Sequence, residues 1–220
     1  MDLTHAAKPR NILYFIFHSL PLALFAYVAY LAQPGSSVFS WHPPIMTLAF
    51  AVLMMEAICI FTHDLGLLPE KAKGWKVTAH WFLQSLGLFA AGFGFIAVYY
   101  NKDLFSKPHF VSWHAWIGLA TIGMTILQVG MGLGTKHAYW YRYFIKPVRI
   151  KNSHLALGIV TLFLSCSSLI LGSASAWFQR ESNASFAYVF MAVCILVHWL
   201  AALNTLSTHK KRLLGKAGED

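Results

Sequence analysis

Four histidines stand at the beginning of four successive apolar segments, and their types and spacing are the first sign of chemistry in this chain. His42 and His114 each end a Ser-Trp-His tripeptide and lie 72 residues apart. His80 and His154 lie 74 residues apart. Ionisable side chains within a membrane are expensive and commonly functional. If successive segments cross a membrane in alternate directions, the sequence predicts two facing histidine pairs, one near each membrane face.

The ligand set of each pair restricts what it can hold. A zinc site needs three or four protein ligands, and no cysteine or carboxylate accompanies either pair. His109 and His114 form an H-x-x-x-x-H box, but no H-x-x-H-H boxes follow it, which disfavours a desaturase-like site. A haem supplies four ring nitrogens and leaves two axial positions for the protein. Four tryptophans adjoin these histidines and suit a haem, but they are only supporting evidence because tryptophan is also common in the aromatic belt at a membrane interface: Trp41, Trp81, Trp113 and Trp116.

The composition predicts the elements that must position these histidines. The chain is 57% hydrophobic and 11% charged, whereas soluble domains carry about 25% charged residues. A membrane crossing needs about 20 apolar residues. We therefore expect an all-α, polytopic membrane protein of one domain (1–220), in which the second to fifth helices form a central four-helix bundle that holds the two histidine pairs and their haems. The six predicted helices are 12–32, 43–63, 76–100, 111–134, 152–177 and 186–207.

The basic residues predict the orientation of these helices. If the N-terminus is cytoplasmic, 14 of the 17 lysines and arginines lie on the cytoplasmic side, and Lys102, Lys107 and Arg180 lie on the opposite side. Cytoplasmic loops of membrane proteins carry an excess of such residues. We therefore expect both termini in the cytoplasm. The net charge of +9 is interpreted as a membrane-orientation signal and not as a nucleic-acid-binding one.

Other polar residues within the helices have less specific interpretations. His18 and His198 are expected to be hydrogen-bonded histidines of the bundle. Glu56 lies fourteen residues after His42, where it is either protonated or paired with a group near a haem propionate. Two rival functions remain: a proton-coupled small-solute transporter with relay histidines, and a structural protein with histidines that hold the bundle together. The histidines of each predicted pair lie at the same depth, and the two pairs lie near opposite membrane faces. This arrangement favours electron transfer over both rival functions.

Four stretches of the sequence resemble the cytochrome b561 family, in particular its short, type 2-like members called cytochrome b561 domain-containing proteins. These stretches are "QPGSSVFSWHPPIM" at 33–46, "TAHWFLQ" at 78–84, "HFVSWHAWIGL" at 109–119 and "KNSHLALG" at 151–158. The resemblance implies a six-helix protein with two bis-histidine haem b groups, an outer one on His42 and His114 and an inner one on His80 and His154. One departure is Thr62 and His63, where secretory-granule members carry a basic residue.

The resemblance also implies the substrates. Family members transfer electrons from cytoplasmic ascorbate to monodehydroascorbate radical or a ferric chelate on the other side of the bilayer. It implies an endoplasmic reticulum or vesicle membrane, and a homodimer is an oligomeric state that the sequence allows. Because ascorbate is an anion, basic residues beside the inner haem are candidate donor-site residues, and two residues before His114 are candidate acceptor-site residues. The donor candidates are Lys73, Lys76, Arg149 and Lys151; the acceptor candidates are Lys107 and His109.

Overall fold

The computed structural model describes residues 12–62, 65–69 and 72–217, and its regular elements in these ranges are all helical. Six stretches are long and apolar enough to cross a membrane. The prediction of an all-α protein with six transmembrane helices is therefore confirmed. The elements are α1 (Ile12–Ala32), η1 (Phe39–Trp41), α2 (His42–Thr47), η2 (Leu48–Leu53), α3 (Met54–Cys59), α4 (Lys73–Leu104), α5 (Trp113–Lys136), α6 (Ala138–Tyr141), α7 (Pro147–Ser173), α8 (Ala176–Glu181) and α9 (Ala184–Ala217).

The second crossing begins and ends earlier than predicted, spanning Phe39–Cys59 instead of 43–63. Its first turn is built by serine side chains that the apolar pattern did not include. The Ser40 hydroxyl accepts hydrogen bonds from the backbone N–H groups of Gly35 and Ser37 and donates one to the Ser37 carbonyl. The prolines that follow His42 are tolerated because first-turn N–H groups have no partner within the helix.

Two other helices begin where local signals place them. Ser112 caps α5, and its hydroxyl accepts a hydrogen bond from the Ala115 N–H at 3.3 Å, the usual role of an N-cap serine. α7 begins at Pro147, five residues before the predicted start, because proline fits the first helical turn. The basic residues between Pro147 and His154 therefore extend the helix instead of forming a loop.

The second crossing also contains a π-helical segment, η2, between His42 and the end of α3. A π-turn holds one extra residue and is commonly found at functional sites. One extra residue rotates the following turns by about 100° relative to the preceding ones, because an α-helix has 3.6 residues per turn. The segment thus sets which face of α3 meets α4, independently of the face that α2 presents.

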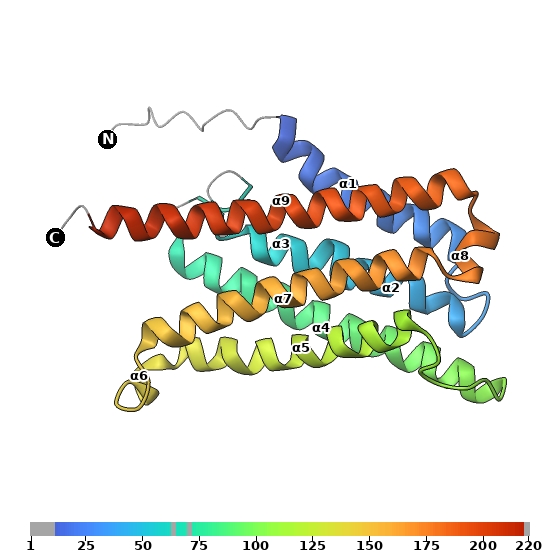
Figure 1. The fold of residues 1–220 in the computed structure, drawn as a ribbon, viewed down its shortest axis with the longest axis horizontal. Coiled ribbons are helices and arrows are strands. Elements are labelled where there is room, and N and C mark those ends of the chain that lie inside the picture. Colours follow the sequence, from blue (N-terminus) through green and yellow to red (C-terminus); the bar gives the residue numbers. More distant parts are fainter. Residues whose placement is uncertain (1–11, 63–64, 70–71, 218–220) are drawn as a thin grey trace.

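The crossings form a bundle that is covered on one side (Figure 1). α4 packs against α2, η2 and α3, while α5 packs against α7. α1 packs on α2 and η2, and α9 packs on α7 and α3. The hydrophobic core includes Phe17 of α1, Met55 of α3 and Val197 of α9, all of which are buried. The four inner crossings thus carry the predicted histidines, and α1 and α9 support them from one side.

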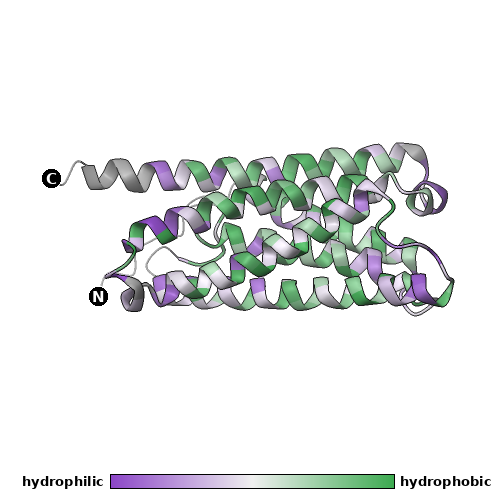
Figure 2. Cartoon of the chain, turned by 60° about the horizontal axis from the view of Figure 1, so that its bottom comes forward, coloured by the Kyte–Doolittle hydropathy of each residue, from purple (hydrophilic) through white to green (hydrophobic). Residues whose placement is uncertain are grey.

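Polar residues gather at the two ends of the bundle, and hydrophobic residues dominate between them (Figure 2). α6 and the beginning of α7 lie at one end, while α8 and the connection between α4 and α5 lie at the other (Figure 1). The first end carries Arg142, Lys146 and Arg149, and the second carries Lys107 and Arg180. This separation is the one expected from the sequence, and which end faces the cytoplasm stays a prediction. Lys8, Arg10 and Lys71 lie outside the described residues.

Candidate functional site

His42 and His114 face each other near the end of the bundle that carries α8. His42 is the first residue of α2, and His114 lies in the first turn of α5. Their ring centroids are 6.1 Å apart, and their planes are inclined by 83°. Each ring is held from behind by a helix backbone: Nδ1–H of His42 donates to the Gly94 carbonyl at 3.0 Å, and Nδ1–H of His114 donates to the Ser168 carbonyl at 3.0 Å. These bonds leave Nε2 of each ring as the nitrogen able to bind a metal.

His80 and His154 form a second facing pair, on α4 and α7. Their ring centroids are 6.3 Å apart, with an angle of 79° between the planes. Nδ1–H of His80 donates to the Ala57 carbonyl at 2.8 Å. Nδ1 of His154 is buried and has no hydrogen-bond partner among the described residues. The structure therefore brings together both predicted pairs, and three of the four rings share one kind of anchor.

The spacing of each pair fits two imidazoles on opposite sides of one metal. A bond from a metal to an imidazole nitrogen is about 2.0 Å and the ring centre lies about 1 Å farther, so the two centres should be about 6 Å apart. No group of three or more His, Cys, Asp or Glu side chains that could hold a metal ion occurs within the described ranges. A bare metal ion would therefore lack ligands, whereas a haem needs only these two.

Glycines in α5 and α7 give the rings their space. A Cβ atom at Gly172 would lie 3.2 Å from Cε1 of His114, and one at Gly132 would lie 3.5 Å from Cε1 of His154. The first of these distances is tighter than ordinary van der Waals contact. Because Gly172 has no side chain, α7 can lie close to His114. The Ser168 carbonyl, one turn earlier on α7, can then accept the hydrogen bond from Nδ1–H of His114.

Three of the four candidate donor-site residues are exposed to the surroundings: Lys73, Arg149 and Lys151. Lys76 is buried, with 5% of its surface accessible. The structure places Arg149 and Lys151 on the first two turns of α7, before His154, and Lys73 and Lys76 on the first turn of α4, before His80. The basic cluster therefore lies at the beginning of the two helices that carry the second histidine pair, as the sequence predicts.

The candidate acceptor-site residues lie at the other end. The His109 ring stacks on Tyr99, with centroids 4.1 Å apart, and its Nε2 lies 2.8 Å from Oδ1 of Asp103. Nζ of Lys107 lies 5.4 Å from the centroid of the Phe105 ring. His109 is thus fixed to the end of α4 by a carboxylate and an aromatic ring, and the sequence pattern did not include either of these partners.

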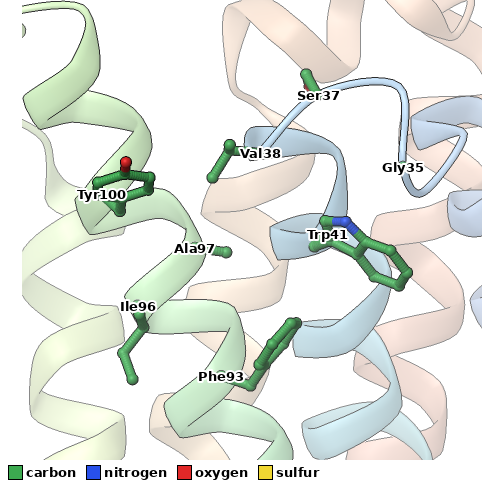
Figure 3. A pocket seen from close by; sticks show the side chains of 8 residues that line it. All are labelled: Gly35, Ser37, Val38, Trp41, Phe93, Ile96, Ala97 and Tyr100. Atoms are coloured by element: carbon green, nitrogen blue, oxygen red, sulfur yellow. The ribbon is translucent and has the colours of Figure 1, made fainter.

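A hollow of about 520 Å³ lies beside the first pair, between α4 and the turn that precedes α2 (Figure 3). Its lining is mostly apolar, and Trp41 and Phe93 point toward it from the two sides. None of the four paired histidines lines it. The hollow is therefore separate from the space between the facing rings.

A second polar pair, between α1 and α3, was missed by the sequence reasoning. Nδ1 of His18 lies 2.6 Å from Oε1 of Glu56, Nε2 of His18 lies 3.2 Å from the Leu65 carbonyl, and the Tyr14 ring packs against the imidazole at 4.4 Å between centroids. His18 was expected to be hydrogen bonded within the bundle, which is confirmed. Glu56 is paired with this histidine of α1. The pairing accounts for the position of Glu56 inside the bundle without a group near a haem propionate.

Replacement of His18 by alanine should lower the free energy of unfolding. The change leaves the Glu56 carboxyl group with neither of its oxygens paired among the described residues, because Oε2 already has no partner there. The loss of one hydrogen bond to a charged or strongly polar group is worth about 1.5–3 kcal/mol. Thermal unfolding in detergent, followed by circular dichroism, measures the change. Glu56→Gln, which keeps an acceptor oxygen, should cost less than Glu56→Leu; equal losses would contradict the role of this hydrogen bond.

Residues 41–179 match the family described as eukaryotic cytochrome b561, and all four paired histidines lie within this range. The chain belongs to the cytochrome b561 family. As a cytochrome b561, it is an integral, multi-pass membrane protein of electron transfer that binds haem b. The family that the four sequence stretches resemble is thus confirmed.

Curated relatives agree with this assignment. The chain is 33% identical over 199 residues to the transmembrane reductase CYB561D2 of Bos taurus, with 89% of each chain covered. It is 31% identical over 176 residues to the probable transmembrane reductase CYB561D1 of Homo sapiens, covering 80% of this chain and 76% of the relative. A lysosomal membrane ascorbate-dependent ferrireductase, CYB561A3 of Rattus norvegicus, is 28% identical to the chain over 155 residues. The match covers 69% of this chain and 58% of the relative. These relatives indicate that this cytochrome b561 is an oxidoreductase.

Proposed function

We propose that this cytochrome b561 is a transmembrane ascorbate-dependent reductase. It transfers electrons from cytoplasmic ascorbate to monodehydroascorbate radical or ferric iron on the opposite side. The observation that carries the proposal is the presence of two facing histidine pairs with ring centroids 6.1 and 6.3 Å apart. The ascorbate-dependent ferrireductase among the relatives supports the donor and one of the acceptors.

We assign the outer haem to His42 and His114 and the inner haem to His80 and His154. A bound haem b supplies reversible one-electron chemistry at its iron. The two imidazoles of a pair would be the protein ligands of its iron, which would disfavour oxygen binding and favour electron transfer. The carbonyls of Gly94, Ser168 and Ala57 hold the N–H of their rings. A hydrogen bond at Nδ1 fixes the tautomer and orientation of a ligating histidine.

Charged groups at the two ends support the direction of transfer. Lys73, Arg149 and Lys151 are exposed near the beginning of α4 and α7, where they attract an anionic donor such as ascorbate. Lys76 lies at the same end but is buried. Lys107 and His109 lie at the opposite end, where an acceptor would approach the outer haem.

The orientation and cellular setting belong to the same proposal. Both termini face the cytoplasm, the membrane is that of the endoplasmic reticulum or of vesicles, and a homodimer is a candidate assembly. The separation of basic residues between the two ends supports the orientation. Accessibility of terminal tags after selective opening of the plasma membrane checks the orientation. Tags that become accessible at this step fit the proposal, and tags that stay protected until the internal membranes are also opened contradict it.

The haem content of the purified protein is the decisive measurement. We expect a b-type spectrum after reduction with ascorbate and about two haems per chain by pyridine haemochrome analysis. In vesicles loaded with ascorbate, an external ferric chelate should then be reduced. A protein that takes up no haem during expression or reconstitution would overturn the proposal and leave the solute-transporter interpretation. A haem-loaded protein that ascorbate does not reduce would overturn the assigned donor.

A further inference from the structure

One half of the bundle is the second crossing with α4, and the other half is α5 with α7. In each half the outer histidine donates its ring N–H to a backbone carbonyl at the same position relative to the inner histidine. The carbonyl that accepts the N–H of His42 belongs to Gly94, fourteen residues after His80 on α4. The carbonyl that accepts the N–H of His114 belongs to Ser168, fourteen residues after His154 on α7. In both halves, therefore, the helix of the inner histidine supplies the anchor for the outer histidine.

This correspondence fails at the inner pair. His80 donates to the carbonyl of Ala57, fifteen residues after His42. The equivalent carbonyl for His154 would be that of Val129, fifteen residues after His114, but no such hydrogen bond is present. The neighbouring side chain, Gln128, reaches across to α7 instead, and its Nε2–H donates to the backbone carbonyl of His154 at 3.0 Å.

Within the part of the chain that the structure describes, Gln128 and His154 each keep one unpaired polar atom. Oε1 of Gln128 is buried without a hydrogen-bond partner among the described residues, and so is Nδ1 of His154. The amide lies close against α7, since a Cβ atom at Gly158 would be 3.4 Å from Nε2 of Gln128. A buried, unsatisfied polar group costs about 1–3 kcal/mol. An acceptor oxygen and an N–H donor on two residues that are already joined by a hydrogen bond can satisfy each other after a small side-chain adjustment or through one buried water.

We propose that Gln128 is the positioning residue of the inner haem ligand His154. Its Nε2 holds the backbone of His154 in this structure, and with the haem bound its Oε1 would accept the N–H at Nδ1 of the same residue, directly or through one buried water. The inference rests on the proposed function, because it takes His154 as an axial ligand. A hydrogen bond at Nδ1 raises the basicity of a ligating imidazole and thereby favours the oxidised iron. Gln128 thus lowers the reduction potential of the inner haem by a side-chain contact, whereas the other three ligands use backbone carbonyls.

The test compares two substitutions in the full-length, haem-loaded protein. Gln128→Met keeps the length of the side chain and removes both hydrogen bonds, whereas Gln128→Glu keeps an acceptor oxygen. Redox titration should show a higher inner-haem potential in the Met variant and a potential at or below that of the unmodified protein in the Glu variant. The low-spin electron paramagnetic resonance signal of the inner haem should shift in the Met variant, while the outer haem keeps its potential.

Gln179→Met is the matched control. Gln179 makes the same kind of bond, from its Nε2 to the Ser173 carbonyl of α7 at 2.8 Å, but at the other end of the bundle. This variant should keep the inner-haem potential. Loss of the inner haem in the Met variant together with its retention in the Glu variant also supports the proposal. An unchanged potential and spectrum in Gln128→Met, or equal loss of haem in both variants, would overturn it.

These outcomes differ from a failure of the proposed function. If the unmodified chain binds no haem, or if His154→Ala keeps both haems with unchanged spectra, the ligand assignment is wrong whatever Gln128 does. If His154→Ala removes the inner haem and Gln128→Met changes nothing, the ligand assignment stands and the role of Gln128 is refuted.

Discussion

Replacement of His42 or His114 by alanine should remove the outer haem and spare the inner one. The two rings are the facing members of one pair, 6.1 Å apart, and neither contacts His80 or His154. Loss of either imidazole would leave the haem of this pair with one protein ligand instead of two. Haem content should fall to about one per chain. Reduction of the remaining haem by ascorbate should stay fast, because the donor-side helices are unchanged, and reduction of an external ferric chelate should fall to background.

His198→Ala is the control for the loss of a buried histidine. His198 lies on α9, where its Nδ1–H donates to the Cys194 carbonyl at 2.8 Å, and it belongs to neither pair. Its removal should keep the haem content of the folded protein. The prediction is checked by pyridine haemochrome analysis and by stopped-flow reduction of each purified variant. If His42→Ala or His114→Ala instead abolishes reduction of the inner haem and keeps the outer signal, the assignment of the two pairs to the two membrane faces is wrong.

The facing pairs could be predicted from the sequence because few quantities determine them. A membrane fixes the direction of successive helices, so the position of a residue along its helix gives its depth. The repeated Ser-Trp-His context of His42 and His114 then indicated a common environment. The helix starts needed finer signals, such as the serine bonds before His42 and the proline that begins α7.

The anchors of the rings could not be predicted, because they are backbone carbonyls that any residue can supply. Which carbonyl meets His80 depends on the rotation of α3, and the π-helical segment η2 resets this rotation. When a transmembrane helix is apolar on all its faces, the spacing of its hydrophobic residues does not indicate which face packs against the neighbouring helices. For the same reason the pairing of Glu56 with His18 was missed, although both residues were recognised as buried polar groups.

A larger side chain at Gly172 should remove the outer haem without a change in any ligand. A Cβ atom there would already lie 3.2 Å from Cε1 of His114. The imidazole cannot retreat easily, because its Nδ1–H is bonded to the Ser168 carbonyl on the same helix as Gly172. In Gly172→Val the branched side chain has one strongly preferred rotamer in a helix, so it cannot turn away from the ring. We expect haem content to fall to about one per chain, as in His114→Ala, and Gly172→Ala to cause a smaller loss.

Gly123→Val separates this steric effect from a general effect of valine in a transmembrane helix. A Cβ atom at Gly123 would meet no atom within 4 Å, and nine residues after His114 place it on about the opposite face of α5. Valine has a higher helix propensity than glycine, so neither substitution should weaken its helix. Haem content and the reduced spectrum should therefore change in Gly172→Val and not in Gly123→Val. Full haem content in Gly172→Val would show that α7 can move away from His114, and the close approach of α7 would then not be required for binding of the outer haem.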